Sequence, residues 1–366
     1  MKNPRREFIK QTAAGMLGMA VSTQTSSAYE SSEGAASTEP GLLGSKERVW
    51  QADPQWRRVK YGDWGGPGVS AKTGPMDTLL LKDHAPRSLV VCQETSVAKA
   101  KFPVIDAHIH TVARTSAEIR QWVKTMDEVG VETSVVLTGA IGAQFDKWVE
   151  AYLKPYPDRF RLYCGMDLIG IDRPDFPKRV TAELERCHEK GACGVGEVSD
   201  KGYGITRDRS LLRHKRLHPD DERLDEFWGK CAELEMPVNL HVADHPSCWT
   251  PLDVYQERIP DYQHFNQYHA PITSHEELIA KRNSALARHP QTIFIACHLG
   301  NQGHDLGALS QAMDKYPNLY VDTSARDYEM GRTPRAAARF LKKYQHRVLF
   351  GTDQGRQKGM YQMHWR

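Results

Sequence analysis

Two histidines separated by a single residue are the first feature of this sequence that could do chemistry. His108 and His110 end an apolar run rich in Val and Ile, which is typical of a buried strand. Side chains alternate along a strand, so both imidazoles should share its inward face. Its other face, toward the surrounding helices, should carry Ile105, Ala107 and Ile109. An HxH pair is also compatible with ordinary polar contacts, and a metal site therefore needs further ligands nearby.

Further ligands are available at the ends of other apolar runs. His241, His298 and Asp353 each stand at the end of a short run of apolar residues. If these runs are parallel strands of one barrel, their carboxyl ends crowd around one axis and bring these side chains together. Burying them without a shared partner would be unfavourable. A divalent cation would be such a partner.

The elements that would hold these residues follow a regular pattern after Phe102. Short runs rich in Val and Ile alternate with longer stretches of helical period. This alternation predicts an α/β fold with a parallel sheet, and eight repeats predict a closed (β/α)8 TIM barrel. The eight predicted strands are Val104 to His110, Thr133 to Thr138, Phe160 to Met166, Ala192 to Val198, Val238 to Val242, Thr292 to His298, Leu319 to Thr323 and Val348 to Thr352.

Helix boundaries agree with this alternation. Ser116 begins a predicted helix that stops at Gly130. Ser274 and Glu277 form a predicted capping box, and Thr333-Pro334 predicts an N-cap followed by proline at the first helical position. The alternative fold, an open doubly wound sheet, would need a glycine-rich phosphate-binding turn after the first strand, where this chain has histidines.

Only a short C-terminal segment follows the last predicted strand of the barrel. Asp106 to Asp353 spans 248 residues, close to one barrel, but only 13 residues follow Asp353. The predicted fold is therefore a barrel with a short or missing eighth helix. Either the chain is a truncated product, or the arm from Trp50 to Lys101 or a second subunit covers the exposed flank. That arm contains two strand-like pieces that could form a hairpin, Thr78 to Leu81 and Ser88 to Val91.

The pattern resembles the amidohydrolase superfamily, specifically the amidohydrolase-related (amidohydrolase 2) branch of metal-dependent barrels. Its landmarks are HxH on the first strand, histidines on the fifth and sixth strands and Asp on the eighth. The resemblance implies that His108, His110, His241 and Asp353 bind metal directly. It also implies that His298 either binds a second metal or acts as a general acid or base.

The fourth strand departs from many relatives with two metals, which carry a carboxylated lysine there. This chain has Glu197, and Lys201 lies beyond the strand. Glu197 has the parity to point into the barrel mouth and could bridge two metals, as in the similar TatD-like nucleases. It could instead accept a hydrogen bond from a ligand histidine and orient it. The sequence therefore leaves both one metal and two metals open.

An imidazole-rich site with a carboxylate favours zinc, although manganese, iron or cobalt would suit the same ligands. Such an ion would lower the pKa of bound water toward about 7 and polarise a carbonyl or phosphoryl oxygen. Asp353 could accept the proton of that water and deliver it to the leaving group. His298 could stabilise an oxyanion. Asp106 is expected to orient His108 or the backbone rather than to bind metal.

Two connections on the predicted catalytic face could bind substrate. The one after strand four is rich in Arg, and the one after strand five is rich in aromatic residues, including Trp249. They could form a lid that excludes water and attracts a carboxylate, or solvated turns in which neighbouring acids balance the cations. Arg326, just past strand seven, is the better candidate for an anion contact, and a surface ion pair would explain it equally well.

Residues 1–28 resemble a twin-arginine signal peptide. Arg5 and Arg6 precede a weakly apolar run that ends in Ser26-Ser27-Ala28, a small-residue pattern suited to cleavage. The twin-arginine route carries folded proteins, so the resemblance implies a bacterial enzyme that is periplasmic or exported. No other run reaches the ~18 apolar residues that a membrane span requires, and no membrane attachment is expected after cleavage.

The mature chain is predicted to have three parts. Residues 29–45, rich in Ser, Glu, Gly and Thr, predict a flexible linker. Residues 46–101 form the N-terminal arm, and residues 102–366 form the predicted metal-dependent barrel.

Composition excludes several classes of protein. With 40% hydrophobic and 26% charged residues, the chain is typical of a soluble globular protein rather than a disordered one. The net charge of +3 comes from the first ten residues, so the neutral remainder offers no electrostatic surface for nucleic acid. Seven cysteines without CxxC spacing favour buried thiols over a disulfide framework. The expected partner is a small molecule, and a homo-oligomer is compatible with the sequence.

The first functional hypothesis is a metal-dependent hydrolase that cleaves a C–O or C–N bond of a small compound, such as an amide, lactone or ester, which could carry a carboxylate. The second is a metal-dependent non-oxidative decarboxylase or hydratase, because relatives with the one-metal ligand set include such lyases. A TatD-like phosphodiesterase is third: Glu197 supports it, and the neutral body opposes it. A binding protein without catalysis is the alternative outside enzymes.

Overall fold

The computed structural model describes residues 78–365 except 90, 92–94, 254 and 259–263. The predicted signal peptide, the linker and the first part of the arm lie outside the described residues. Residues 78–95 belong to a unit separate from the barrel. There Leu81–Asp83 form one turn of 3-10 helix, and the described residues of the expected hairpin form no strand, so that prediction is wrong.

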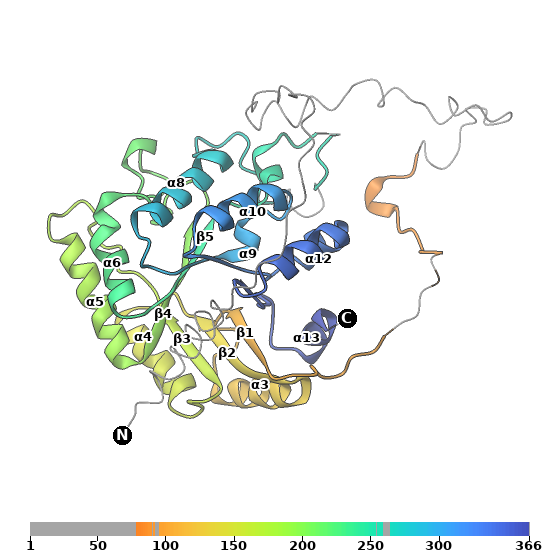
Figure 1. Ribbon diagram of the computed structural model, residues 1–366, viewed down its shortest axis with the longest axis horizontal. Helices are drawn as coiled ribbons and strands as arrows, with labels where there is room; N and C mark the ends of the chain where they lie inside the picture. Colours follow the sequence, from red (N-terminus) through yellow and green to blue (C-terminus); the bar gives the residue numbers. More distant parts are fainter. Residues whose placement is uncertain (1–77, 90, 92–94, 254, 259–263, 366) are drawn as a thin grey trace, which may run out of the picture. The chain divides into compact units, whose positions relative to one another are not determined.

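Eight parallel strands form one sheet in sequence order, as predicted for a (β/α)8 barrel (Figure 1). A helix follows each strand, and the sheet rolls into a barrel with the helices outside. The strands are β1 Val104–Ile109, β2 Val131–Leu137, β3 Phe160–Cys164, β4 Ala192–Asp200, β5 Val238–Val242, β6 Phe294–Ala296, β7 Leu319–Asp322 and β8 Val348–Leu349. All eight predicted strands are confirmed, and β6 and β8 are shorter than predicted.

Contacts between β8 and β1 close the barrel. The backbone N–H of Ala107 donates to the Phe350 carbonyl at 2.9 Å, and the N–H of Asp353 donates to the His108 carbonyl at 2.8 Å. The buried carboxylate of Asp106 adds a side-chain bond across the same seam, since it accepts from the Thr352 hydroxyl at 2.8 Å and the Thr352 N–H at 3.0 Å. Closure brings the ends of the first and last strands together.

The alternation of side chains along β1 is interrupted. Ile105 and Ala107 line a cavity of 280 Å³ together with residues of β2, β3, β4, β6, β7 and β8, the end of α6 (Asp225–Glu233) and the connections before β5 and β6, so they point into the barrel and not toward the outer helices as predicted. Ile109 does pack in the outer core, as predicted. The pairing of β1 with β2 shifts between Asp106 and Ile109. This shift reverses the parity, so that His108 also points inward.

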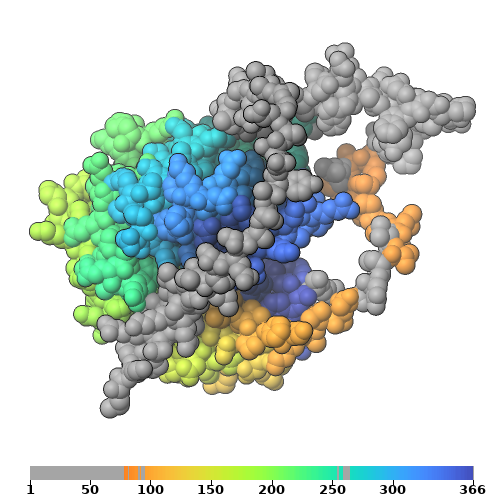
Figure 2. Space-filling model, viewed as in Figure 1, coloured from red at the N-terminus to blue at the C-terminus, as the bar shows by residue number. Residues whose placement is uncertain are grey.

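Ten α-helices surround the described strands, and their side chains form a continuous outer layer over α5, α6, α8 and α10 (Figure 2). The helices are α3 Ser116–Val129, α4 Gly142–Trp148, α5 Phe176–Lys190, α6 Asp225–Glu233, α8 His275–Arg288, α9 Cys297–Gly300, α10 Leu306–Lys315, α11 Asp327–Arg332, α12 Pro334–Lys343 and α13 Lys358–His364. Short helical turns span Val149–Leu153, Arg213–Lys215, Glu222–Leu224 and Pro246–Trp249.

The predicted helix ends are largely confirmed. α3 runs from Ser116 to just before Gly130, whose φ of 87° lets the helix end in a left-handed residue. The capping box of Ser274 and Glu277 is present at the start of α8. α12 begins at Pro334 with Thr333 as its N-cap residue, as predicted, although the Thr333 side chain makes no capping hydrogen bond.

The last helix, α13, is short and covers the flank beside α3. Tyr361 is fully buried there, and its hydroxyl accepts the indole N–H of Trp122 at 3.2 Å. The indole of Trp365 donates to the Val129 carbonyl at 3.2 Å. The short eighth helix predicted from the sequence is therefore present and packed.

The described thiols follow the expectation of buried, unpaired cysteines. All six described cysteines are free, and five of them are buried; Cys92 lies outside the described residues. Among the described helices, none combines the length and apolar character that crossing a membrane needs.

Candidate metal centre

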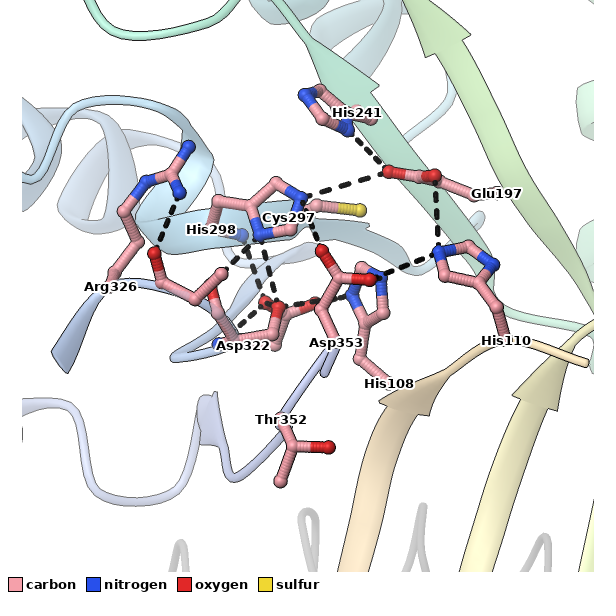
Figure 3. A network of polar contacts seen from close by, with 12 residues as sticks. His108, His110, Glu197, His241, Cys297, His298, Asp322, Arg326, Thr352 and Asp353 are labelled. Carbon is pink, nitrogen blue, oxygen red and sulfur yellow. Dashed lines mark hydrogen bonds and ion pairs between the residues drawn. The ribbon is translucent and has the colours of Figure 1, made fainter. Parts of the chain in front are cut away.

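Six polar side chains meet at the carboxyl ends of the strands (Figure 3). They come from five places in the barrel: β1 and the residue after it, β4, β5, the turn after β6 and the turn after β8. They are the six residues predicted as metal ligands, namely His108, His110, Glu197, His241, His298 and Asp353. The structure thus brings together groups that lie far apart in the chain.

His108 supplies the clearest test of whether these residues suit a metal. Its side chain is fully buried, and Nδ1 lies 2.8 Å from the Asp322 carboxylate. Because a carboxylate accepts, the neutral ring carries its hydrogen on Nδ1 and its lone pair on Nε2, where a cation would take the place of a second proton. Nε2 is buried without a hydrogen-bond partner and faces Asp353 at 3.6 Å. A carboxylate–histidine–metal arrangement would use this nitrogen, so the residues present fit a divalent cation.

His110 and His298 are held in the same way. Nδ1 of His110 lies 3.1 Å from the Leu137 carbonyl, and Nδ1 of His298 lies 2.8 Å from the Ser324 carbonyl. A carbonyl can only accept, so both rings carry hydrogen on Nδ1 and present Nε2 to the centre. Nε2 of His110 lies 3.2 Å from Asp353, and Nε2 of His298 lies 3.8 Å from it.

His241 is oriented the other way round. Its Nε2 lies 3.0 Å from Asp244 and its Nδ1 contacts Glu197, so both nitrogens face acceptors; with a cation bound, Asp244 would keep the hydrogen on Nε2 and Nδ1 would be the ligand atom. Glu197 also lies 3.6 Å from Nε2 of His110 and 3.8 Å from Nε2 of His298. Its carboxylate therefore lies between His110 on one side and His241 and His298 on the other.

The electrostatics of the centre favour positive charge. Burial opposes protonation of His108, but Asp322, Asp353 and Glu197 outweigh it and raise its pKa to about 9. Burial works against ionisation of Glu197 too, yet the pKa of Glu197 falls far below its usual range because of His241. The pKa of Asp353 is likewise lowered, by its hydrogen bond to His110, despite burial. Both carboxylates are therefore ionised at neutral pH.

The six residues fall into two triplets of ligand atoms, and two overlapping triplets also join His108 to His298 and Asp322 and to Glu197 and Cys297. The ligand atoms of His108, His110 and Asp353 all lie within 4.8 Å of one another, and so do those of Glu197, His241 and His298. Each group offers imidazole nitrogens and one carboxylate oxygen, a donor set that suits zinc, manganese, iron or cobalt. The side chains of His110 and Asp353 are the most exposed, at 39% and 24%, so the centre opens to solvent beside them.

Asp322, at the end of β7, is a functional residue that the sequence analysis missed. Besides His108, it accepts the backbone N–H of His298 at 2.8 Å. The signal was available, because Asp322 is a buried acid at the end of a predicted strand, like Asp353 after β8. Asp106 behaves as predicted: it accepts the His108 N–H at 3.3 Å and does not contact the centre through its carboxylate.

The two predicted substrate-binding residues lie differently. Arg326 is buried beside His298 in Figure 3 and donates to Asn301 at 2.6 Å. It also pairs with Glu329 at 3.3 Å. Trp249 donates its indole N–H to a backbone carbonyl at 3.1 Å and packs against a neighbouring imidazole, outside the group of six. A substrate contact of either side chain stays a prediction.

These observations define a (β/α)8 barrel with a candidate metal centre at the carboxyl ends of its strands. A family model described as amidohydrolase matches residues 105–365. The chain belongs to this amidohydrolase family. A search of curated proteins gives no match.

Solved structures with a similar fold are distant in sequence. A 2,6-dihydroxybenzoate decarboxylase from Rhizobium is 18% identical, with a TM-score of 0.45, covering 72% of this chain and 91% of that chain. A dihydroxybenzoic acid decarboxylase from Polaromonas sp. JS666, solved with bound manganese, is 16% identical, with a TM-score of 0.47 and coverage of 72% and 90%. An uncharacterized TIM-barrel protein from Bordetella bronchiseptica is 18% identical, with a TM-score of 0.45 and coverage of 72% and 90%.

Proposed function

We propose that this protein is a metal-dependent hydrolase that cleaves a C–O or C–N bond in a small molecule, such as a lactone, ester or amide. The observation that carries the proposal is the pair of adjacent ligand groups with Glu197 between them. These residues would hold one or two divalent cations, and such cations would supply the Lewis acidity that activates water.

The residues have separate tasks in this reaction. A bound divalent cation supplies Lewis acidity, which polarises the substrate oxygen and makes water more acidic. Asp353 accepts a proton from water, since its carboxylate is ionised and partly exposed beside His110. His298 presents the lone pair of Nε2 to the same space and would hold a cation there together with Glu197 and His241. Asp322 keeps His108 in the tautomer that leaves Nε2 available.

Non-oxidative decarboxylation is the second candidate, and the contact between Glu197 and His241 favours it. If Glu197 and His241 stay hydrogen-bonded to each other and bind no metal, a single cation would be held by His108, His110 and Asp353. His298 would then be free of metal, and its Nε2 could take a proton from solvent and pass it to the carbon that loses carbon dioxide. The substrate would be a carboxylic acid whose carboxylate binds at the cation.

Metal counting combined with product analysis separates the two candidates. The purified protein is stripped with a chelator and reloaded with zinc or manganese, and the metal per chain is measured. We expect two ions per chain in the wild type, one in Glu197→Gln, and hydrolysis within a panel of lactones, esters and amides. One ion in both proteins, with release of carbon dioxide from an aromatic acid and no hydrolysis, would establish decarboxylation instead.

Two histidine variants, one at the centre and one away from it, test metal binding directly. His108→Ala should remove nearly all bound metal, because it deletes the buried nitrogen that lacks any other partner. His289→Ala is the matched control, since His289 pairs with Asp225 away from the centre. Unchanged metal content in His108→Ala would rule out a metal-dependent enzyme of this kind.

A further inference from the structure

A partly exposed lysine stands at the edge of the candidate centre and has no role in the chemistry described above. Lys201 follows the last residue of β4, and its ammonium group donates to Asp244 at 2.9 Å. Asp244 comes two residues after the end of β5. Both residues therefore lie at the carboxyl ends of adjacent strands, on the face where the centre opens.

Asp244 is shared between Lys201 and the centre. The same oxygen, Oδ1, that accepts from Lys201 lies 3.0 Å from Nε2 of His241. The Asp244 side chain is only 13% exposed, whereas that of Lys201 is 39% exposed. One buried carboxylate thus holds a candidate metal ligand on one side and an accessible cation on the other.

The hydrogen-bonding capacity of Lys201 is not filled. An ammonium group has three N–H donors and no acceptor. Among the described residues, Asp244 is the one side chain that accepts from Lys201. Its other two donors have no hydrogen-bond partner among the described residues, and the side chain is 39% exposed at the edge of the centre.

The charge of Asp244 does not cancel that of Lys201 completely. Asp244 also bonds to His241, so its negative charge acts on two partners. The positive charge of Lys201 also acts on the neighbouring His241 ring and disfavours its protonation. An ammonium group that keeps part of its charge and two donors beside an active site suits a carboxylate.

We propose that Lys201 binds a carboxylate group of the substrate, so that the substrate is a small organic acid with a carboxylate separate from the group that reacts. This assignment rests on the proposed function only in placing the reacting group at the centre. Asp244 is a positioning residue: it fixes Lys201 relative to His241 and so sets the distance between the two ends of the substrate.

Binding of dicarboxylic acids tests this without knowledge of the substrate. Succinate, glutarate and adipate are each compared with their monoamides, which keep the length and lose one charge. Binding to the metal-loaded protein is measured by calorimetry. We expect at least one diacid to bind about tenfold more tightly than its monoamide, because a hydrogen bond to a charged group is lost in the amide.

Variants assign that preference to a single side chain. In Lys201→Met and Lys201→Gln the diacid and its monoamide should bind equally, whereas Lys201→Arg should keep the preference. Lys281→Met is the matched control: Lys281 is 33% exposed and pairs with Asp220 at 3.6 Å, so it loses the same charge from a comparable ion pair. Metal content and thermal midpoint are measured for every variant to show that each is folded and loaded.

Three results would overturn the proposal. They are no preference for any diacid in the wild type, an undiminished preference in both Lys201→Met and Lys201→Gln, and an equal loss in Lys281→Met. None of them depends on turnover or on the number of ions. A wild-type protein that binds no metal would instead contradict the proposed function.

Discussion

At the scale of single residues, the position of one hydrogen on each ring decides what the centre can bind. His108, His110 and His298 each give the Nδ1 hydrogen to a fixed acceptor, which leaves Nε2 facing the carboxylates. Two of these acceptors are backbone carbonyls, and the third is the Asp322 side chain. The tautomer of His108 is therefore set by the Asp322 side chain, and substitution of Asp322 can test this.

Replacing Asp322 by asparagine should weaken metal binding without removing a ligand. The amide loses the negative charge, and it accepts less strongly from His108 and from the His298 backbone. Loss of such an outer carboxylate typically costs about 10- to 100-fold in metal affinity. The dissociation constant is measured by competition with a chelator.

The control for this prediction is Asp314→Asn. Asp314 is an exposed carboxylate that pairs with Lys343 at 2.8 Å on the outer helices. It loses the same charge far from the centre. Equal metal affinity in Asp322→Asn and the wild type would mean that the His108 tautomer does not depend on Asp322.

A histidine away from the centre predicts how stability changes with pH. Burial lowers the pKa of His275 to about 4, and the neighbouring His304 adds to this. The unfolded chain has a higher pKa at this histidine, about 6.5, so it binds the proton first as the pH falls. The stability from keeping His275 neutral is complete above about pH 6.5 and is lost progressively down to about pH 4.

His275→Gln should remove this contribution. The free energy of unfolding is measured with urea at several pH values between 4 and 6.5, and its slope should fall by up to about 1.4 kcal/mol per pH unit. His289→Gln is the control, since it removes a different histidine, one that pairs with Asp225 at 2.9 Å. An identical pH slope in His275→Gln and the wild type would contradict the prediction.

The sequence was sufficient to predict the six residues of the centre but not their partners. Histidines and acids at strand ends are recognisable because the barrel brings those ends together. Asp322 and Asp244 are also acids at strand ends, yet their role is to hold a ring rather than to face the centre. Which ring each one holds depends on the register between strands, and no sequence pattern gives that distance.

At the scale of elements, the seam between β8 and β1 is where the barrel depends on side chains. The Thr352 hydroxyl donates to the buried Asp106 carboxylate across this seam. Burial raises the pKa of Asp106 to about 6, although the bonds to Thr352 and His108 work against it. These hydrogen bonds offset part of the free-energy cost of burying the Asp106 carboxylate.

Thr352→Val removes the hydroxyl while keeping the shape of the side chain. It leaves Asp106 with an unsatisfied buried oxygen, so we expect a loss of about 1–3 kcal/mol in the free energy of unfolding. The measurement is urea denaturation followed by circular dichroism. Thr206→Val is the control, because the Thr206 hydroxyl accepts one weak bond at 3.4 Å in an exposed turn. Equal losses in both variants would show that the seam has no special role.

The strands were predictable from apolar runs, but the geometry at their ends was not. Four residues at strand ends, Ala243, His298, Ala325 and Asp353, have φ between 49° and 65° without being glycine. Such a conformation costs about 1–3 kcal/mol in an ordinary residue, and the rest of the fold must hold it. Local sequence preference points away from these turns. The parity change in β1 escapes prediction for the same reason, because it comes from pairing with β2.

At the scale of the whole molecule, the centre exists only when the barrel is closed. Its ligands come from the first, fourth, fifth, sixth and eighth strands or the turns after them. Because the unfolded chain lacks this arrangement, metal binding is linked to folding. If the predicted twin-arginine signal is functional, the chain would fold and acquire its metal before export, because that route carries folded proteins.

The twin-arginine assignment, which lies outside the described residues, makes the last prediction. Replacing Arg5 and Arg6 by lysine keeps both positive charges, so a signal that needs only charge should still function. A twin-arginine signal needs the guanidinium pair, and export should therefore stop. The measurement is cell fractionation with mass spectrometry of the N-terminus: the wild type should appear in the periplasm cut after Ala28, and the lysine variant should stay in the cytoplasm at full length.

The control replaces Lys2 and Lys10 by glutamine, which removes two charges from the same segment and should leave export intact. Continued export of the lysine variant would contradict the assignment and leave the place of action of this enzyme to be argued on other grounds.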